Sequence, residues 1–123
     1  MGEVKREVMF YRRQSGGCPV EDFLDSLPGK VAQKVAWVLQ LAEDLDRVPR
    51  QYFCKLAGAE EIWEFRVRWG TNVYRVLAFW DGNRVVLTHG FVKKTQRTPL
   101  GEIERAGHYR RDYFERKGRH ERF

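Results

Sequence analysis

The chain has 123 residues, of which 42% are apolar, and its formal net charge of +6 makes a polyanion the first partner to consider. This length suits a single domain with one hydrophobic core, and two cysteines are too few for a disulfide framework. No apolar run approaches the roughly 18 residues of a membrane span, and the N-terminus lacks a signal-peptide apolar region, so we expect a cytoplasmic protein.

The first half of the chain predicts one strand and two helices. Residues 3–12 have strand propensity and end at a Gln-Ser-Gly-Gly turn. A short helix is expected over residues 19–27, where a proline opens the first turn. A longer helix is expected over residues 30–46, because apolar residues recur there at spacings of four and three. These residues are Val31, Val35, Val38, Ala42 and Leu45. Trp37 and two leucines widen the stripe, which predicts a well-buried helix.

The second half predicts an antiparallel meander. Residues 51–56 form a short edge strand or an extended lead-in to the next strand. Residues 61–69 alternate with a period of two, so that Glu64 lies on one face with Arg66 and Arg68, and the apolar residues lie on the other. Residues 73–80 and 84–92 continue the sheet after turn sequences.

A last helix is expected over residues 99–116, with Thr98 as its N-terminal cap and Pro99 at its first position. Residues 117–123 are expected to be a frayed basic tail. The order of elements predicts one α+β domain, an antiparallel sheet with helices against one face and the opposite face open. Arg66 and Arg68 are expected on that open face.

Four stretches of the chain carry a family resemblance: PVEDFLDSLP, IWEFRVRW, VYRVLAFW and VVLTHGFVKKTQRTPLGEIERA. Together they resemble the RelE/ParE toxin superfamily, and within it the phage-derived HigB-like branch, over about residues 10–111. The most specific part is GFVKKTQRTP. The resemblance implies a single RelE-like domain over residues 1–123, with two N-terminal helices on one face of the sheet and a C-terminal helix, in the order β-α-α-β-β-β-β-α.

The same resemblance implies an activity and partners. It implies the toxin of a type II toxin-antitoxin pair, an mRNA interferase that cleaves mRNA on the ribosome and so inhibits translation. It implies no metal and no cofactor, no membrane, and a small helix-turn-helix antitoxin as cognate partner.

Five basic residues match positions of the family pattern. Arg66 and Arg68 match the basic residues of its second strand, and Arg75 matches the arginine of its third. Lys93 and Lys94 match the basic pair that closes the fourth strand. The best-studied members also use a tyrosine in the final helix region, where this chain reads PLGE over residues 99–102.

Metal-free RNA cleavage requires a base, an acid and cations that stabilise a crowded phosphorane. We assign Arg66 and Arg75 to the phosphate, because a guanidinium holds phosphate oxygens in fixed geometry and stays charged. Lys93 or Lys94 could carry the proton, since neighbouring cations lower a lysine pKa. His89 is the rival candidate, with an ordinary pKa near 6.5.

Further residues are expected to bind RNA. They are Lys55, Arg68, Phe91, Gln96 and Arg97. Phe91 would stack on a base, as aromatics among cations do in single-stranded RNA sites. A cluster of basic residues in the last helix is read as a solvated face that attracts phosphates. It consists of Arg110, Arg111, Arg116 and Lys117.

Each of these assignments has a plainer alternative. Arginines on one strand face can be a solvated surface, and lysines at a strand end can protect an edge. Phe91, Trp63 and Trp69 are more often core residues than stacking platforms. Two other functions also stay open. A ParE-like relative would inhibit DNA gyrase, and the missing tyrosine fits a non-catalytic module that binds RNA or antitoxin.

Overall fold

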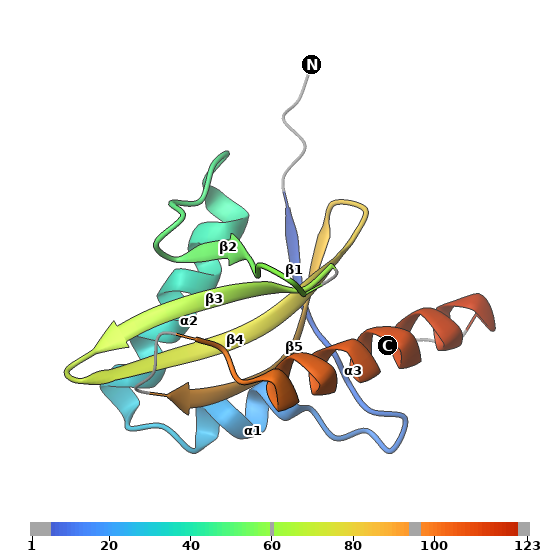
Figure 1. Ribbon diagram of the computed structural model, residues 1–123, viewed down its shortest axis with the longest axis horizontal. Coiled ribbons are helices and arrows are strands. Elements are labelled where there is room, and N and C mark those ends of the chain that lie inside the picture. Colours follow the sequence, from blue (N-terminus) through green and yellow to red (C-terminus); the bar gives the residue numbers. More distant parts are fainter. Residues whose placement is uncertain (1–5, 60, 94–96, 121–123) are drawn as a thin grey trace.

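The computed structural model describes residues 6–59, 61–93 and 97–120, which form three helices and a five-stranded sheet (Figure 1). The elements in chain order are β1 (Glu7–Phe10), α1 (Pro19–Asp25), α2 (Gly29–Asp44), β2 (Phe53–Lys55), β3 (Trp63–Trp69), β4 (Asn72–Asp81), β5 (Arg84–Lys93) and α3 (Leu100–Gly118). The expected α+β class is confirmed. None of the helices in these ranges has the length and apolar content needed to cross a membrane.

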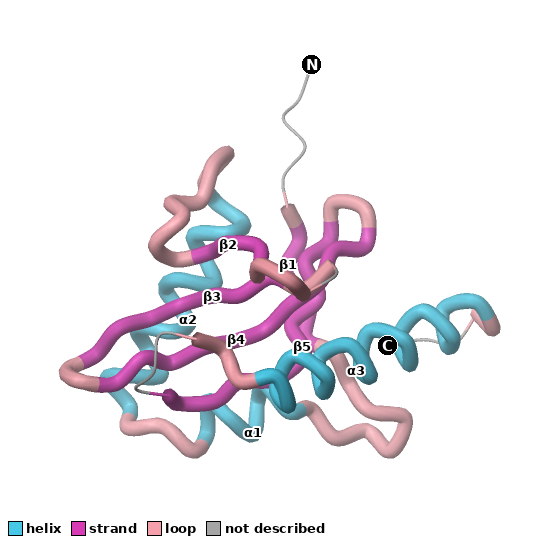
Figure 2. Tube along the Cα trace, in the orientation of Figure 1, coloured by secondary structure: helices cyan, strands magenta, loops and turns pink. Residues whose placement is uncertain are grey.

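The sheet is mixed, with strand order β1-β5-β4-β3-β2. Strands β2 to β5 form the expected antiparallel meander, and short loops join β3 to β4 and β4 to β5 (Figure 2). The expectation of a purely antiparallel sheet is wrong at β1, which pairs parallel with β5. A parallel pair needs a long crossover connection, and the helices and strands between β1 and β5 supply it.

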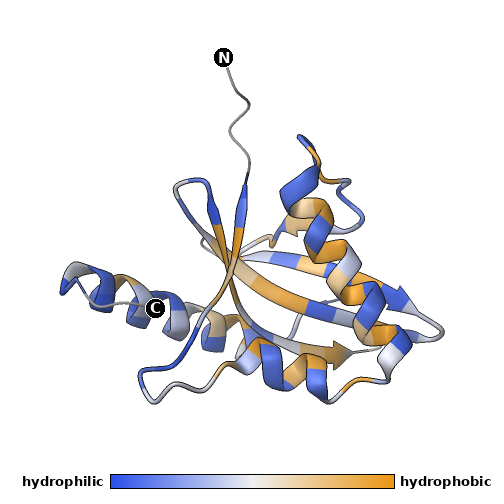
Figure 3. Cartoon of the chain, turned by 180° about the vertical axis from the view of Figure 1, so that it is seen from behind, coloured by the Kyte–Doolittle hydropathy of each residue, from blue (hydrophilic) through white to orange (hydrophobic). Residues whose placement is uncertain are grey.

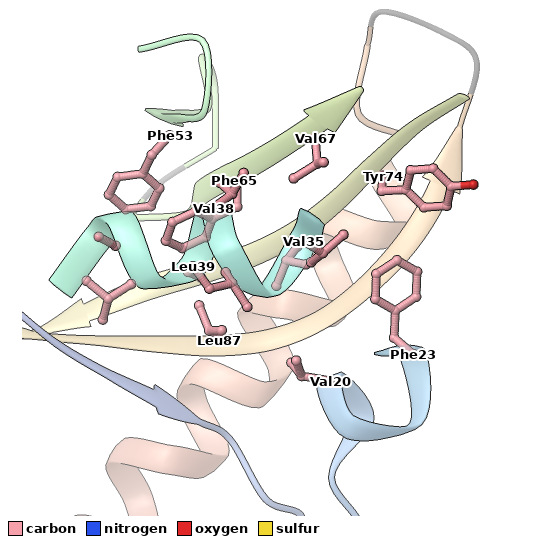
Figure 4. Close-up of a cluster of buried hydrophobic side chains, with 14 of the residues drawn as sticks. Val20, Phe23, Val35, Val38, Leu39, Phe53, Phe65, Val67, Tyr74 and Leu87 are labelled. Atoms are coloured by element: carbon pink, nitrogen blue, oxygen red, sulfur yellow. The ribbon is translucent and has the colours of Figure 1, made fainter. Parts of the chain in front are cut away.

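One face of the sheet packs on α1 and α2, and the main core lies between them (Figure 4). Seen from behind, α2 lies in front of the sheet and α1 lies beside β5, and both helices show hydrophilic positions on their outer sides (Figure 3). The predicted stripe is correct for four of its residues, because Val31, Val35, Val38 and Ala42 are all buried. The expectation for Trp37 is wrong, since 51% of this residue is exposed. Leu45 follows the end of α2 and is also exposed.

Helix α3 lies across the opposite face of the sheet (Figure 1), which corrects the expectation that this face is open. Two smaller clusters join α3 to the sheet. In one, Phe79 packs with Tyr109 and Tyr113, and in the other, Leu77 and Phe91 pack with Ala106 and its neighbours. These strand residues alternate with those of the main core, so both faces of β4 and β5 are buried.

The two ends of α3 also differ from expectation. Thr98 does not cap the helix, because Pro99 occupies the N-cap and Thr98 Oγ1 donates instead to Glu64 Oε1 at 2.6 Å. The helix continues to Gly118, two residues beyond the expected end. Arg116 is not part of a solvated face. It is 3% exposed, lies 2.8 Å from Asp112 and donates to the carbonyl of Arg12.

Candidate functional site

Two of the expected cations meet at a buried carboxylate. Arg66 on β3 stands directly opposite Arg75 on β4, and like charges in such a pair repel. Glu64, which is fully buried, separates them. Its carboxylate accepts hydrogen bonds from Arg75 Nη1 at 2.8 Å, Arg66 Nη2 at 3.1 Å and the Thr98 hydroxyl at 2.6 Å. The three donors satisfy a charge that would otherwise be costly to bury.

The two arginines of this network differ in their exposure to solvent. Arg75 is 1% exposed and also lies 3.5 Å from Thr98 Oγ1, so its guanidinium is held beneath the surface. The expected direct contact between Arg75 and a phosphate therefore does not fit the geometry. The side chain of Arg66 is 31% exposed and reaches solvent. Arg66 can bind an anion while Arg75 holds Glu64.

A cleft of about 440 Å³ opens above this network, and we call it the Arg66 cleft. It lies between the loop after β2 and the start of α3. It is lined by Leu56, Ala57, Arg66, Arg97, Thr98 and Ile103. Arg97 is exposed, so two expected cations meet here with one hydroxyl. Lys55 borders an adjoining depression that shares Leu56 and Ala57. The structure thus brings three predicted residues, Lys55, Arg66 and Arg97, to one region.

A second cleft of about 310 Å³ lies at the edge of the sheet, and we call it the edge cleft. It is lined by Lys34, Gln51, Tyr52, Arg66 and Arg68. Arg68 is exposed, as expected. Because Arg66 lines both clefts, it stands at the junction of two basic depressions.

His89 lies away from both clefts, among buried residues. Its Nδ1 lies 3.1 Å from the Thr88 hydroxyl, and its Nε2 lies 3.5 Å from Glu102 without a hydrogen bond among the described residues. Burial lowers the pKa of His89 from 6.5 to about 4, and the positive charge of Arg105 adds to the effect. The imidazole is therefore neutral at pH 7, and its contact with Glu102 is not an ion pair.

The remaining expected residues divide into two groups. Phe91 is only 9% exposed and packs in the core beneath α3, so it offers no face to a base, and the plainer alternative is correct. Lys93 is the last residue of β5, opposite Val73. The Lys93 side chain lies outside the described part of the structure, as do Lys94 and Gln96.

Sequence reasoning missed the role of Glu64 in the site, although strand parity already placed its carboxylate on the same face as Arg66. Tyr109, which lines neither cleft, forms a separate polar cluster, because its hydroxyl accepts from Arg13 Nη2 at 2.9 Å and Arg105 Nε at 3.0 Å. Burial alone would raise the pKa of Tyr109, but these hydrogen bonds and positive charges lower it. Arg105 could have been paired with Tyr109 by its four-residue spacing on a helix, but no local signal pointed to Arg13.

The fold and the two clefts define a small basic α+β domain in which Arg66, Arg68 and Arg97 line two adjoining depressions at a mixed sheet. The family model for phage-derived Gp49-like proteins (DUF891) matches residues 22–111. The chain therefore belongs to the phage-derived Gp49-like family, which is part of the RelE/ParE-like toxin superfamily and commonly contains toxins of toxin-antitoxin systems. A search among curated proteins finds no match.

Proposed function

We propose that this chain is a HigB-like toxin of a type II toxin-antitoxin pair, and that it cleaves mRNA on the ribosome without a metal ion. The observation that carries the proposal is the Arg66 cleft. The chain belongs to the toxin superfamily, and its Arg66 and Arg97 line one depression that is open to solvent. The hydroxyl-bearing residue Thr98, which precedes α3, lines the same depression. Exposed guanidinium groups are suited to a phosphate that gains charge during cleavage.

The proposed reaction uses the RNA's own 2′-hydroxyl as the nucleophile. A base takes the 2′ proton, the 2′-oxygen attacks the neighbouring phosphorus, and the bond to the 5′-oxygen breaks as an acid protonates that oxygen. Arg66 stabilises the phosphorane, and Arg75 acts as a positioning residue because it holds Glu64 beside Arg66. Lys93 and Lys94 remain the proposed proton carriers. The burial of His89 argues against it in this role.

Translation arrest tests the proposal. Expression of the chain in bacterial cells should stop protein synthesis and leave cleaved mRNA, mapped by primer extension. Arg66→Ala and Arg97→Ala should each relieve the arrest. Arg47→Ala is the matched control, since Arg47 is exposed, carries the same charge and lies outside both clefts.

The outcomes separate the possible functions. Arrest that persists in both cleft variants refutes the Arg66 cleft as the active site. Intact mRNA together with a DNA-damage response points instead to inhibition of gyrase.

A basic cleft also suits an antitoxin that covers it. We propose a small helix-turn-helix partner whose acidic or helical segment occupies the Arg66 cleft, because complementary charge guides association and occlusion needs no further chemistry. The product of the neighbouring reading frame should co-purify with the chain. Arg66→Ala and Arg97→Ala together should weaken this association more than Arg47→Ala does, and equal association would exclude the cleft as the contact surface.

A second candidate function is a non-catalytic module that binds RNA or antitoxin. The burial of both Arg75 and His89 favours it, because neither side chain can reach a bound phosphate directly. Purified chain and translating ribosomes distinguish the two candidates. RNA binding without any new 5′ end would support the module and refute the nuclease.

A further inference from the structure

The edge cleft has a feature that cleavage in the Arg66 cleft does not require, namely exposed tryptophans at its border. Trp69 is 40% exposed and Trp37 is 51% exposed, whereas Trp63 and Trp80 pack against the main core. Indole rings are normally buried because of their large apolar area. Two exposed indoles beside one cleft therefore point to a surface that contacts a ligand.

Both indoles contact residues that line the edge cleft. The Lys34 ammonium lies 5.7 Å from the centre of the Trp69 ring, and Lys34 also donates to the carbonyl of Arg68 at 2.7 Å. Trp37 packs edge-on against Tyr52, with ring centres 5.9 Å apart. These contacts hold the rings in place, and fixed rings lose little entropy when a flat ligand stacks on them.

The cleft exists because the outer strand of the sheet is short. Strand β2 pairs with β3 only as far as Phe65, and the last bond across this edge joins Arg66 N to the Tyr52 carbonyl at 2.8 Å. Beyond this point Arg68 and Trp69 have no strand on that side among the described residues. The side chain of Lys34 from α2 reaches the strand edge instead.

The charges at this edge are of one sign. Lys34, Arg66 and Arg68 line the edge cleft, and within the described ranges no carboxylate or aliphatic side chain lines it. Of these three cations only Arg66 contacts a carboxylate among the described residues, at 3.1 Å from Glu64, which also pairs with Arg75. A groove for a protein helix would need aliphatic anchors. Cations with neighbouring aromatic rings match the sugar-phosphate backbone and unpaired bases of single-stranded RNA.

We propose that the edge cleft binds a single-stranded RNA segment, with phosphates on Lys34 and Arg68 and an unpaired base stacked on Trp69. This proposal rests on the proposed action on RNA and adds where the strand lies. Because Arg66 lines both clefts, a strand held at the edge leads directly into the Arg66 cleft. Nucleotides on one side of the cleaved bond would therefore be held by the edge cleft.

Fluorescence anisotropy tests the proposal by measuring the affinity for a fluorescein-labelled oligouridylate at several KCl concentrations. The oligonucleotide has about eight nucleotides, a length that such sites can span. Trp69→Ala should weaken binding roughly 5- to 150-fold with an unchanged salt slope, because stacking releases no counterions. Arg68→Ala should reduce the slope of log K against log salt by about 0.7, the value for one phosphate contact on a single strand. Trp69→Phe should restore part of the affinity, and Arg47→Ala should keep the wild-type slope and affinity.

Several results would overturn the edge site. One is that Trp69→Ala binds the oligonucleotide as tightly as the wild type does. Another is that the wild type binds a duplex of the same length equally well. A third is that Trp69→Ala weakens only the binding of the antitoxin. Failure of the proposed nuclease gives a different result from failure of the edge site. If only the nuclease proposal is wrong, oligonucleotide binding still depends on Trp69 but no RNA is cleaved. Cleavage with binding independent of Trp69 would refute the edge site alone.

Discussion

Replacing Arg75 should destabilise the fold because its partner is a fully buried carboxylate. Arg75→Met removes the 2.8 Å contact, and among the described residues it leaves Glu64 with two donors, the partly exposed Arg66 and the Thr98 hydroxyl. Removing one partner of a buried ion pair costs about 3–5 kcal/mol, a large share of a total stability of about 5–15 kcal/mol. For a chain of this length the midpoint of thermal unfolding should fall by about 12–20 °C.

Urea unfolding of a double-mutant cycle measures this effect. Glu64→Gln combined with Arg75→Met should cost at least about 1 kcal/mol less than the sum of the single changes, because the double variant buries no unpaired charge. Arg12→Met is the matched control. Arg12 pairs with Glu21 at 2.7 Å, but the two side chains are 45% and 47% exposed, so the change should cost less than about 1 kcal/mol.

The reasoning is refuted if Arg75→Met costs no more than Arg12→Met, or if the changes at Glu64 and Arg75 are additive. The outcome also decides how activity is tested. If Arg75 variants unfold, a loss of toxicity in them says nothing about catalysis. Arg66 and Arg97 then become the informative positions.

Three further predictions concern His89, two glycines and Tyr109. The pKa of His89 lies at about 4, below its ordinary 6.5, so the unfolded chain binds the proton more readily. The free energy of unfolding should therefore be highest above about pH 6.5 and should fall by up to about 3 kcal/mol as the pH drops towards 4. In urea unfolding, His89→Gln should show a smaller fall over the same pH range. Gly90→Ala would place its Cβ 2.2 Å from the Phe23 ring and should cost about 1–3 kcal/mol in denaturant unfolding, whereas Gly107→Ala inside α3 should stabilise by about 0.8–1 kcal/mol. Tyr109 should ionise below its ordinary pKa of 10 because of its two arginine partners, so absorbance titration of Tyr109→Phe should lack the earliest phase, and an unchanged titration would contradict this.

Local patterns were sufficient for much of the fold. The period-two alternation of β3 correctly placed Phe65 and Val67 in the core and Glu64 with Arg66 on the other face. The apolar spacing of α2 correctly predicted four buried residues. Such patterns work because the pleat and the helical turn set side-chain direction within a few residues. They were wrong for Trp37 on α2 and for Trp69 at the end of β3, which are 51% and 40% exposed.

The candidate site was only partly predictable, because its side chains come from segments that are distant in the sequence. Arg66 and Arg75 belong to different strands, and their meeting at Glu64 follows from the register between β3 and β4. Burial of His89 and Phe91 follows from α3, which crosses a face that strand alternation alone left open. Neither the register nor the position of a distant helix is encoded by periodicity within one segment.

The amino-acid sequence by itself determined the α+β class, most of the core face of α2 and β3, and a basic surface in a chain of the toxin superfamily. Only the tertiary structure decided which cations remain available to a ligand. Charge is a property of each residue, but access to a ligand is a property of its surroundings. Arg75 is buried beside the Glu64 carboxylate and the Thr98 hydroxyl, while Arg66 and Arg68 stand where the short β2 leaves the edge of the sheet uncovered.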